Sequence, residues 1–176
     1  MNENLKTTKY RNGDPIPNVN NWKVWDTIKS GAYYNYDNNT SIANTYSRLY
    51  NWHAVNDPRN ISPAGWHVAT YDEWATLIDF LDGDAVAGGK LKEVGTTHWD
   101  SPNTGATDAI GFEALPGGLR YGTGAYFGMG ALGLFWSADE YDNTYARYFH
   151  LSYDIAEIYR YQGFKWHGFA VRCIKD

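Results

Sequence analysis

The side chains best suited to catalysis in this chain are one cysteine and a scatter of serines, histidines and acids. Because Cys173 is the only cysteine, it can neither close an intramolecular disulfide nor build a cysteine-rich zinc site. The pattern Gly-x-Ser-x-Gly, which exposes a nucleophilic serine on a sharp turn, does not occur. We therefore expect no catalytic residue and interpret Cys173 as a small apolar core residue.

The histidines and acids show no spacing typical of a metal site. The five histidines are His53, His67, His98, His150 and His167. No two of them form a His-x-x-x-His pair, so a zinc site would need ligands from distant loops. We interpret His67 and His98, each beside a tryptophan, as structural. The acidic stretch 139–143 could bind a hard cation such as Ca²⁺, but a solvated acidic turn is the simpler interpretation. We expect no required metal and no cofactor.

Charge and hydropathy limit the partners. The net charge of -5 and the absence of lysine or arginine runs argue against nucleic acid. The glycine-rich stretch 122–124 lacks the Gly-Lys-Ser/Thr of a phosphate loop and predicts a turn. No segment approaches the roughly 20 apolar residues of a membrane span, so we expect no membrane insertion. The first residues lack an apolar signal-peptide core, which leaves an intracellular protein or a domain targeted by a segment outside this chain.

Aromatic residues are the most distinctive feature of the composition. They make up 17% of the chain, with 15 Tyr, 8 Trp and 7 Phe, more than a core of this size normally absorbs. Tyrosine and tryptophan at a surface usually serve recognition, because they offer large, stiff contact areas. The candidate ligand-binding residues lie in the last third of the chain: Tyr145, Tyr148, His150, Tyr159, Tyr161, Phe164, Trp166 and His167.

Strand alternation gives these rings an expected orientation. In the segment 145–152 one face carries Tyr145, Arg147, Phe149 and Leu151, and the other carries Ala146, Tyr148, His150 and Ser152. We expect the first face to meet the core, so that Tyr148 and His150 face solvent. If Ile158 packs inward, Tyr159 and Tyr161 point outward. An alternative remains open, in which the rings only cover a small β core.

The elements that would hold these residues are short. Thr70 and Glu73 predict a capping box at the start of a helix with an apolar stripe ending near Gly83. A second helix is predicted from Asp84, weakened by the glycine pair 88–89. The spacing of apolar residues over 46–54 predicts a further short helix. Strands are predicted over 134–138, 145–151, 155–161 and 168–174, the segment 96–131 is loop-dominated, and residues 1–44 are expected to wrap the core.

A length of 176 residues suits a single domain over 1–176. Motifs spread over nearly the whole chain resemble, in order, those of the Fibrobacter succinogenes major paralogous domain. They are 2–5 (NENL), 49–52 (LYNW), 63–68 (PAGWHV), 88–92 (GGKLK), 111–118 (GFEALPGG), 136–137 (WS) and 168–173 (GFAVRC). That family is similar to the formylglycine-generating and sulfatase-modifying proteins. The resemblance implies a C-type-lectin-like α+β fold with few helices, short antiparallel strands and long loops.

One departure from the family bears on chemistry and compartment. Many members carry a cysteine just before Pro-x-Gly-Trp-His, where this chain has Ser62. The resemblance then implies that a disulfide worth about 2 to 4 kcal/mol is absent, and an oxidising compartment is less strongly indicated. The enzymatic relatives use paired reactive cysteines, which Cys173 alone cannot reproduce.

The resemblance also shapes the expected function. We expect a non-catalytic domain that binds a protein or glycan ligand at a bacterial cell surface or outside the cell, as an adhesin-type protein. Some C-type-lectin-like proteins of this kind resemble the targets of diversity-generating retroelements, which rewrite chosen codons; every candidate residue above except Trp166 would then be variable. The alternatives are a structural module of a cell-surface assembly and, less favoured, an oxidase relative. The oligomeric state is left open.

Overall fold

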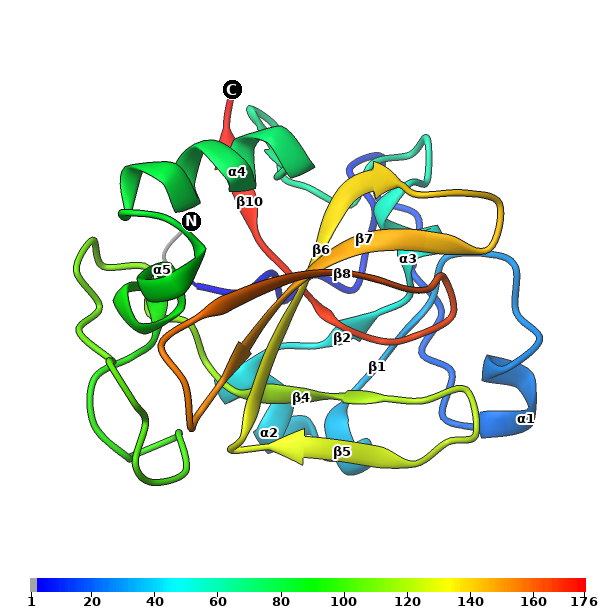
Figure 1. The fold of residues 1–176 in the computed structure, drawn as a ribbon. Coiled ribbons are helices and arrows are strands. Elements are labelled where there is room, and N and C mark those ends of the chain that lie inside the picture. The colour runs from blue at the N-terminus through cyan, green and yellow to red at the C-terminus, as the bar shows by residue number, and fades with distance from the viewer. Residues whose placement is uncertain (1–2) are drawn as a thin grey trace.

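The computed structural model describes residues 3–176, and that part of the chain has an α+β architecture (Figure 1). Its helices are α1 (Trp22–Trp25), the 3₁₀ helix η1 (Tyr36–Asn38), α2 (Thr40–Tyr46), α3 (Trp52–Val55), α4 (Tyr71–Phe80) and α5 (Asp84–Leu91). Its strands are β1 (Tyr33–Tyr34), β2 (Leu49–Tyr50), β3 (Trp66–Val68), β4 (Gly117–Arg120), β5 (Tyr126–Met129), β6 (Leu132–Glu140), β7 (Tyr145–Ser152), β8 (Ile158–Phe164), β9 (Ala170–Val171) and β10 (Cys173–Lys175). The expected fold class, with few helices and short, mostly antiparallel strands, is confirmed. Asn2, in the first family motif, lies outside the described residues.

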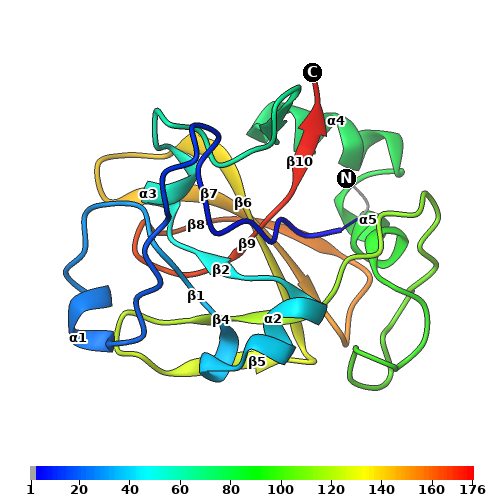
Figure 2. The same cartoon turned by 180° about the vertical axis from the view of Figure 1, so that it is seen from behind.

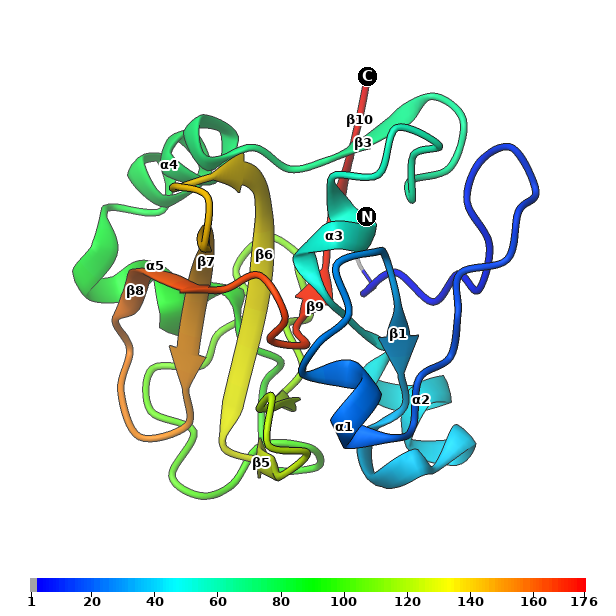
Figure 3. The same cartoon turned by 90° about the vertical axis from the view of Figure 1, so that its right-hand side faces the viewer.

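The centre of the molecule is a four-stranded sheet in the order β8-β7-β6-β9, which Figure 3 shows from left to right. The strands β6, β7 and β8 are antiparallel neighbours, whereas β9 runs parallel to β6. Across β7 the register pairs Tyr148 with Trp136 on one side and with Tyr161 on the other. Three two-stranded sheets, β1-β2, β3-β10 and β4-β5, surround this centre.

Helices α4 and α5 cover one face of the central sheet (Figure 1). The predicted capping box is present, because the Thr70 hydroxyl accepts the Glu73 amide and the Glu73 carboxylate accepts the Thr70 amide. The apolar stripe of α4 then packs on the sheet. The buried cluster on this face includes Trp74, Ile78, Leu81, Ala87, Leu91, Phe135, Phe149, Leu151 and Ile158.

Helix α5 forms despite its glycine pair because the glycines permit close packing. A β-carbon on Gly88 would lie 2.4 Å from the Glu157 carbonyl oxygen, and one on Gly89 would lie 2.3 Å from that of Gly105. Just after the helix, the buried Lys92 ammonium donates to three carbonyl oxygens at 2.8 to 2.9 Å, those of residues 104, 152 and 155. Helix α5 is therefore packed with its backbone directly against the backbone of residues 105 and 156–157.

The N-terminal segment builds the opposite side of the core, which corrects the expectation that it only wraps it. Leu5, Tyr10 and Ile16 are buried beside Trp136 and Phe169. The segment also binds the end of the chain: the Leu5 amide donates to the Val171 carbonyl at 2.9 Å. Figure 2 shows this dark blue segment running across β9. A third cluster, lying around α1 and β1, consists of Trp25, Ala32, Tyr34 and Leu49.

Three further predictions are wrong. The helix expected over 46–54 is broken, because Ser47 has a φ of 91° and residues 49–50 form β2, paired with β1. Backbone bonds to neighbouring strands outcompete the helical spacing there. The strand expected over 168–174 divides into β9 and β10, which belong to different sheets, and the one expected from Ile155 begins only at Ile158.

Candidate functional site

The structure divides the eight predicted binding residues into two groups. The first, here named the sheet-face cluster, consists of Tyr148, His150, Tyr159, Tyr161 and His167. Its strand members face each other across β7 and β8, where the register pairs residue 150 with 159 and 148 with 161. The second, the end cluster, consists of Tyr145, Phe164 and Trp166 and lies at the opposite end of the same two strands.

The rings of the sheet-face cluster form a continuous series from the core to the surface. The Tyr148 ring centroid lies 4.6 Å from that of Phe169 and 6.0 Å from that of Trp136, two buried rings. On its other side Tyr161 follows at 5.9 Å, and Tyr159 stacks on Tyr161 at 5.6 Å with an interplanar angle of 23°. Because Tyr161 is 45% exposed, the series ends in solvent.

Tyr148 and His150 do not face solvent as alternation predicted. Both are half-buried, and Ala146 on the same face is fully buried. The reason is that β7 is an inner strand whose second face is also partly covered, by the buried cluster that includes Leu119 and Phe169. Burial, followed by the nearby Tyr161 hydroxyl, raises the pKa of Tyr148 to about 12. Burial likewise lowers the pKa of His150.

A cavity of about 140 Å³ opens beside these rings. Its walls are Leu119, Tyr121, Leu132, Leu134, Tyr148, His150, His167 and Phe169. Burial lowers the pKa of His167 to about 4, so its imidazole is neutral near pH 7. The buried Nε2 of His150 has no hydrogen-bond partner among residues 3–176. The cavity therefore combines apolar walls with imidazoles whose neutral form is favoured by burial.

Sequence reasoning missed two exposed rings next to this cavity. Tyr121 follows β4 and is 40% exposed, and Phe127 in β5 is 55% exposed. The Tyr121 ring centroid lies 5.6 Å from that of His167 and 6.5 Å from that of Phe127. The predicted turn at 122–124 is the tip of this β4-β5 hairpin. In the sequence, the aromatic residues on both sides of the glycine-rich turn could have indicated a hairpin.

The end cluster is a second stack of rings. Phe164 lies between Tyr145, at 4.6 Å between centroids, and Trp166, at 4.3 Å with an interplanar angle of 17°. A centroid distance of 5.5 Å from Phe164 to His167 connects it to the sheet-face cluster. Trp166 also lines a pocket of about 400 Å³ that the sheet-face cluster does not reach.

The acidic stretch 139–143 uses its carboxylates within the protein. Asp139 accepts the backbone amide of Tyr71, Glu140 pairs with Lys165, and Asp142 accepts the amides of residues 144 and 145. Residues 3–176 contain no group of three or more His, Cys, Asp or Glu side chains placed to hold a metal ion. These contacts agree with a structural turn.

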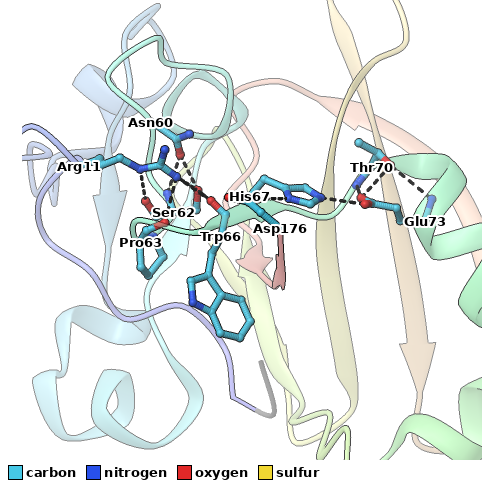
Figure 4. A network of polar contacts seen from close by, with 9 residues as sticks. All are labelled: Arg11, Asn60, Ser62, Pro63, Trp66, His67, Thr70, Glu73 and Asp176. Carbon is cyan, nitrogen blue, oxygen red and sulfur yellow. Dashed lines mark hydrogen bonds and ion pairs between the residues drawn. The ribbon is translucent and has the colours of Figure 1, made fainter.

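A polar network joins the N-terminal segment, β3 and α4 (Figure 4). The Ser62 hydroxyl bonds to the Asn60 side chain at 2.6 Å and to the Trp66 carbonyl at 2.7 Å. His67 turns the other way, with Nδ1 2.7 Å from Asp176 and Nε2 2.8 Å from Glu73. Hydrogen bonds to Asp176 and then to Glu73 raise the pKa of His67. Because no bond joins Ser62 to His67, the network does not form a catalytic triad.

The sole cysteine is not placed for chemistry. Cys173 is 3% exposed and begins β10 opposite Val68. Burial raises the pKa of its thiol to about 11, so the reactive thiolate is scarce near pH 7.

Comparison with known proteins gives one positive result. A family model described as the Fibrobacter succinogenes major domain matches residues 1–175, which include both clusters. The searches of curated proteins and of solved structures returned no match. The C-type-lectin-like assignment and the retroelement hypothesis stay predictions. None of the helices within residues 3–176 has the length and apolar character needed to cross a membrane.

Proposed function

The chain belongs to the Fibrobacter succinogenes major domain family, and we propose that it is a non-catalytic domain that binds a macromolecular ligand, a protein or a glycan, through the sheet-face cluster. The observation that carries the proposal is the ring series that leads from buried Phe169 and Trp136 through Tyr148 to exposed Tyr161. Tyr148, inside the series, also lines the cavity, together with exposed Tyr121.

The ring series supports binding because its members are held before a ligand arrives. A ring that is already packed loses little conformational freedom on association, which lowers the entropic cost of the complex. Tyr159 and Tyr161 stack on each other, and Tyr121 contacts His167. Tyrosine also offers a hydroxyl at the edge of an apolar ring, so the same surface can contact protein side chains or sugar rings.

The chemistry of the chain supports a non-catalytic role. An oxidase relative would need a reactive thiolate, and burial keeps the Cys173 thiol protonated near pH 7. If Cys173 nevertheless served as a redox residue, a substrate-dependent oxygen consumption would disappear in Cys173→Ser.

We further propose that the C-terminal segment is diversified by a retroelement and acts at the cell surface or outside the cell. A diversified position must accept many side chains, and exposed Tyr161 and half-buried Tyr159 suit that role. Tyr148 packs on two core rings, so we expect position 148 to vary less than positions 159 and 161. Sequencing the source locus tests the idea. We expect a near-repeat of the codons for 135–176 that differs mainly at adenines, and an adjacent gene for a reverse transcriptase. A locus that contains neither would refute the hypothesis.

The proposed function is tested by a screen of glycans and bacterial surface proteins, run with and without EDTA. We expect one ligand to bind in both conditions, and Tyr161→Ala and Tyr121→Ala to abolish binding while thermal unfolding stays nearly unchanged. The matched control is Tyr141→Ala, which removes a tyrosine that is 51% exposed outside the cluster. Binding that survives both Tyr161→Ala and Tyr121→Ala would contradict the proposal.

A structural role in a cell-surface assembly is the second candidate, favoured by one observation. Strand β8 is an edge strand of the central sheet, and an edge offers backbone groups to another chain. Light scattering over a range of concentrations should then show assembly that Gln162→Pro blocks. A monomer at all concentrations would exclude assembly through this edge.

A further inference from the structure

The pocket beside Trp166 is a candidate site separate from the sheet-face cluster. It lies where the α1-β1 connection, α3, the β6-β7 turn and the β8-β9 connection meet, and its volume is about 400 Å³, within the roughly 300 to 1,000 Å³ usual for small-molecule sites. Its walls are Asp26, Thr27, Ile28, Lys29, His53, Asn143, Thr144, Lys165 and Trp166.

One wall is an indole whose position is fixed. Phe164 stacks on Trp166 at 4.3 Å, and the glycine at 122 lets the backbone pass the indole edge, because a β-carbon there would lie 2.8 Å from Nε1. Trp166 lines the pocket and Phe164 does not. An immobilised aromatic ring of this kind offers a flat apolar surface for the C–H groups of a ligand.

The other walls carry polar groups that the protein does not use. Asp26, Lys29 and Asn143 supply a carboxylate, an ammonium and an amide, and within residues 3–176 none of these three side chains makes a hydrogen bond or an ion pair. Together they offer both donors and acceptors. The cavity of the sheet-face cluster is different, because neither a carboxylate nor an amide side chain lines it.

The charges around the pocket are nearly balanced. Lys165 is neutralised by Glu140, which leaves Lys29 and Asp26 as opposite charges on the lining. Burial first, and then Lys165 and Lys29, lower the pKa of His53, so its imidazole is neutral near pH 7 and can donate or accept one bond. A mixed, nearly neutral set of donors and acceptors does not select a free anion or cation.

We propose that this pocket binds a pyranose sugar, with the ring against Trp166 and the hydroxyl groups bonded by Asp26, Lys29 and Asn143. Sugar hydroxyls both donate and accept, and pyranose rings present apolar C–H faces, so they match this combination of groups. The inference rests on the proposed function, because it takes the chain to be a binding domain. It deepens that function by naming a class of ligand and a place for it. It assigns the saccharide to the pocket beside Trp166 and leaves the sheet-face cluster to a protein partner.

The test uses the full chain and a panel of simple sugars as probes: the methyl pyranosides of glucose, galactose and mannose, N-acetylglucosamine and glucuronate. Saturation-transfer NMR and calorimetry measure binding. We expect at least one probe to bind with a Kd of about 1 mM and Trp166→Ala to weaken it by at least about 10-fold. Asn143→Ala, at an exposed position, should weaken it without affecting folding.

Two controls separate this inference from the proposed function. Trp22→Ala removes a tryptophan that is 47% exposed but does not line the pocket, and Tyr161→Ala alters the sheet-face cluster; both should leave sugar affinity unchanged. Failure of every probe to bind at about 20 mM, or affinity unchanged in both Trp166→Ala and Asn143→Ala, would overturn the inference. Sugar binding lost only in Tyr161→Ala would overturn it too, while supporting the proposed function.

Discussion

The two faces of the central sheet are built on different principles. On the helix face, Phe149 is fully buried against Trp74, and glycine contacts bring α5 onto the backbone after β7. On the other face, the preceding residue, Tyr148, is only half-buried and leads outward through Tyr161 to solvent. One strand therefore places one set of rings in the core and the alternate set in a series that reaches solvent.

The largest expected contrast is between these two neighbouring rings. Truncating a fully buried phenylalanine leaves a cavity, so Phe149→Ala should lower the free energy of unfolding by about 3 to 5 kcal/mol. Tyr148→Ala opens a site that already borders a cavity and should cost less, about 1 to 3 kcal/mol. Urea denaturation of both variants measures the difference. Equal losses would mean that the two faces carry the fold equally.

A second contrast compares one glycine on each face. A β-carbon on Gly89 meets a carbonyl oxygen at 2.3 Å, whereas one on Gly163 meets ring atoms of Tyr148 and Phe169 at 3.2 Å. Backbone cannot move aside as rings can, so Gly89→Ala should destabilise the protein by about 1 to 3 kcal/mol.

Gly163→Ala should cost clearly less, because its neighbours need to shift by only a few tenths of an ångström. Helix propensity alone would make Gly89→Ala stabilising by about 1 kcal/mol. The sign of the measured change in unfolding free energy therefore tests the packing argument. A stabilised Gly89→Ala, read from the midpoint of urea unfolding, would refute it.

The third expected contrast is a difference in pH dependence. The pKa of His167 is lowered to about 4, and the unfolded chain has a histidine pKa of about 6.5. Between these values the unfolded chain binds more protons, so the His167 contribution is complete above about pH 6.5 and is lost as the pH falls toward 4. His67 acts in the opposite sense, because its pKa is raised in the folded protein. The protonated imidazole stabilises the fold at low pH, and this contribution is lost as the pH rises through the folded-state pKa.

Urea titrations of wild type and His167→Gln between about pH 4 and 7 measure this term. The variant should lose less stability on acidification than wild type does. His150, whose pKa is also lowered by burial, remains and keeps part of the acid sensitivity. An identical pH profile for the two proteins would show that the imidazole of His167 is not buried in its neutral form.

Local signals predicted the parts of the fold that local bonds determine. The capping box of α4 is complete within Thr70 and Glu73, and the strands β6 and β7 follow from their own alternation. Tertiary contacts decided the rest. Tyr50 has helical spacing, yet its amide donates to the Phe169 carbonyl, and alternation cannot indicate that an inner strand such as β7 is covered on both faces.

The candidate site was predicted as a set of residues but not as an arrangement. Its members come from adjacent strands, and alternation correctly placed Tyr148 with His150 and Tyr159 with Tyr161. The pocket beside Trp166 also needs Asp26 and His53, which lie more than 100 residues earlier in the sequence. Contacts over that distance leave no periodic trace in one chain.

The contact between the first and last segments has a consequence for biosynthesis. Leu5 is buried and bonded to Val171, and Asn4 accepts a hydrogen bond from the Arg172 guanidinium at 2.7 Å. A ribosome releases residues 171–172 only after nearly all of these 176 residues have been translated. The apolar N-terminal side chains therefore stay exposed throughout elongation. We expect chaperones to bind the nascent chain during that time.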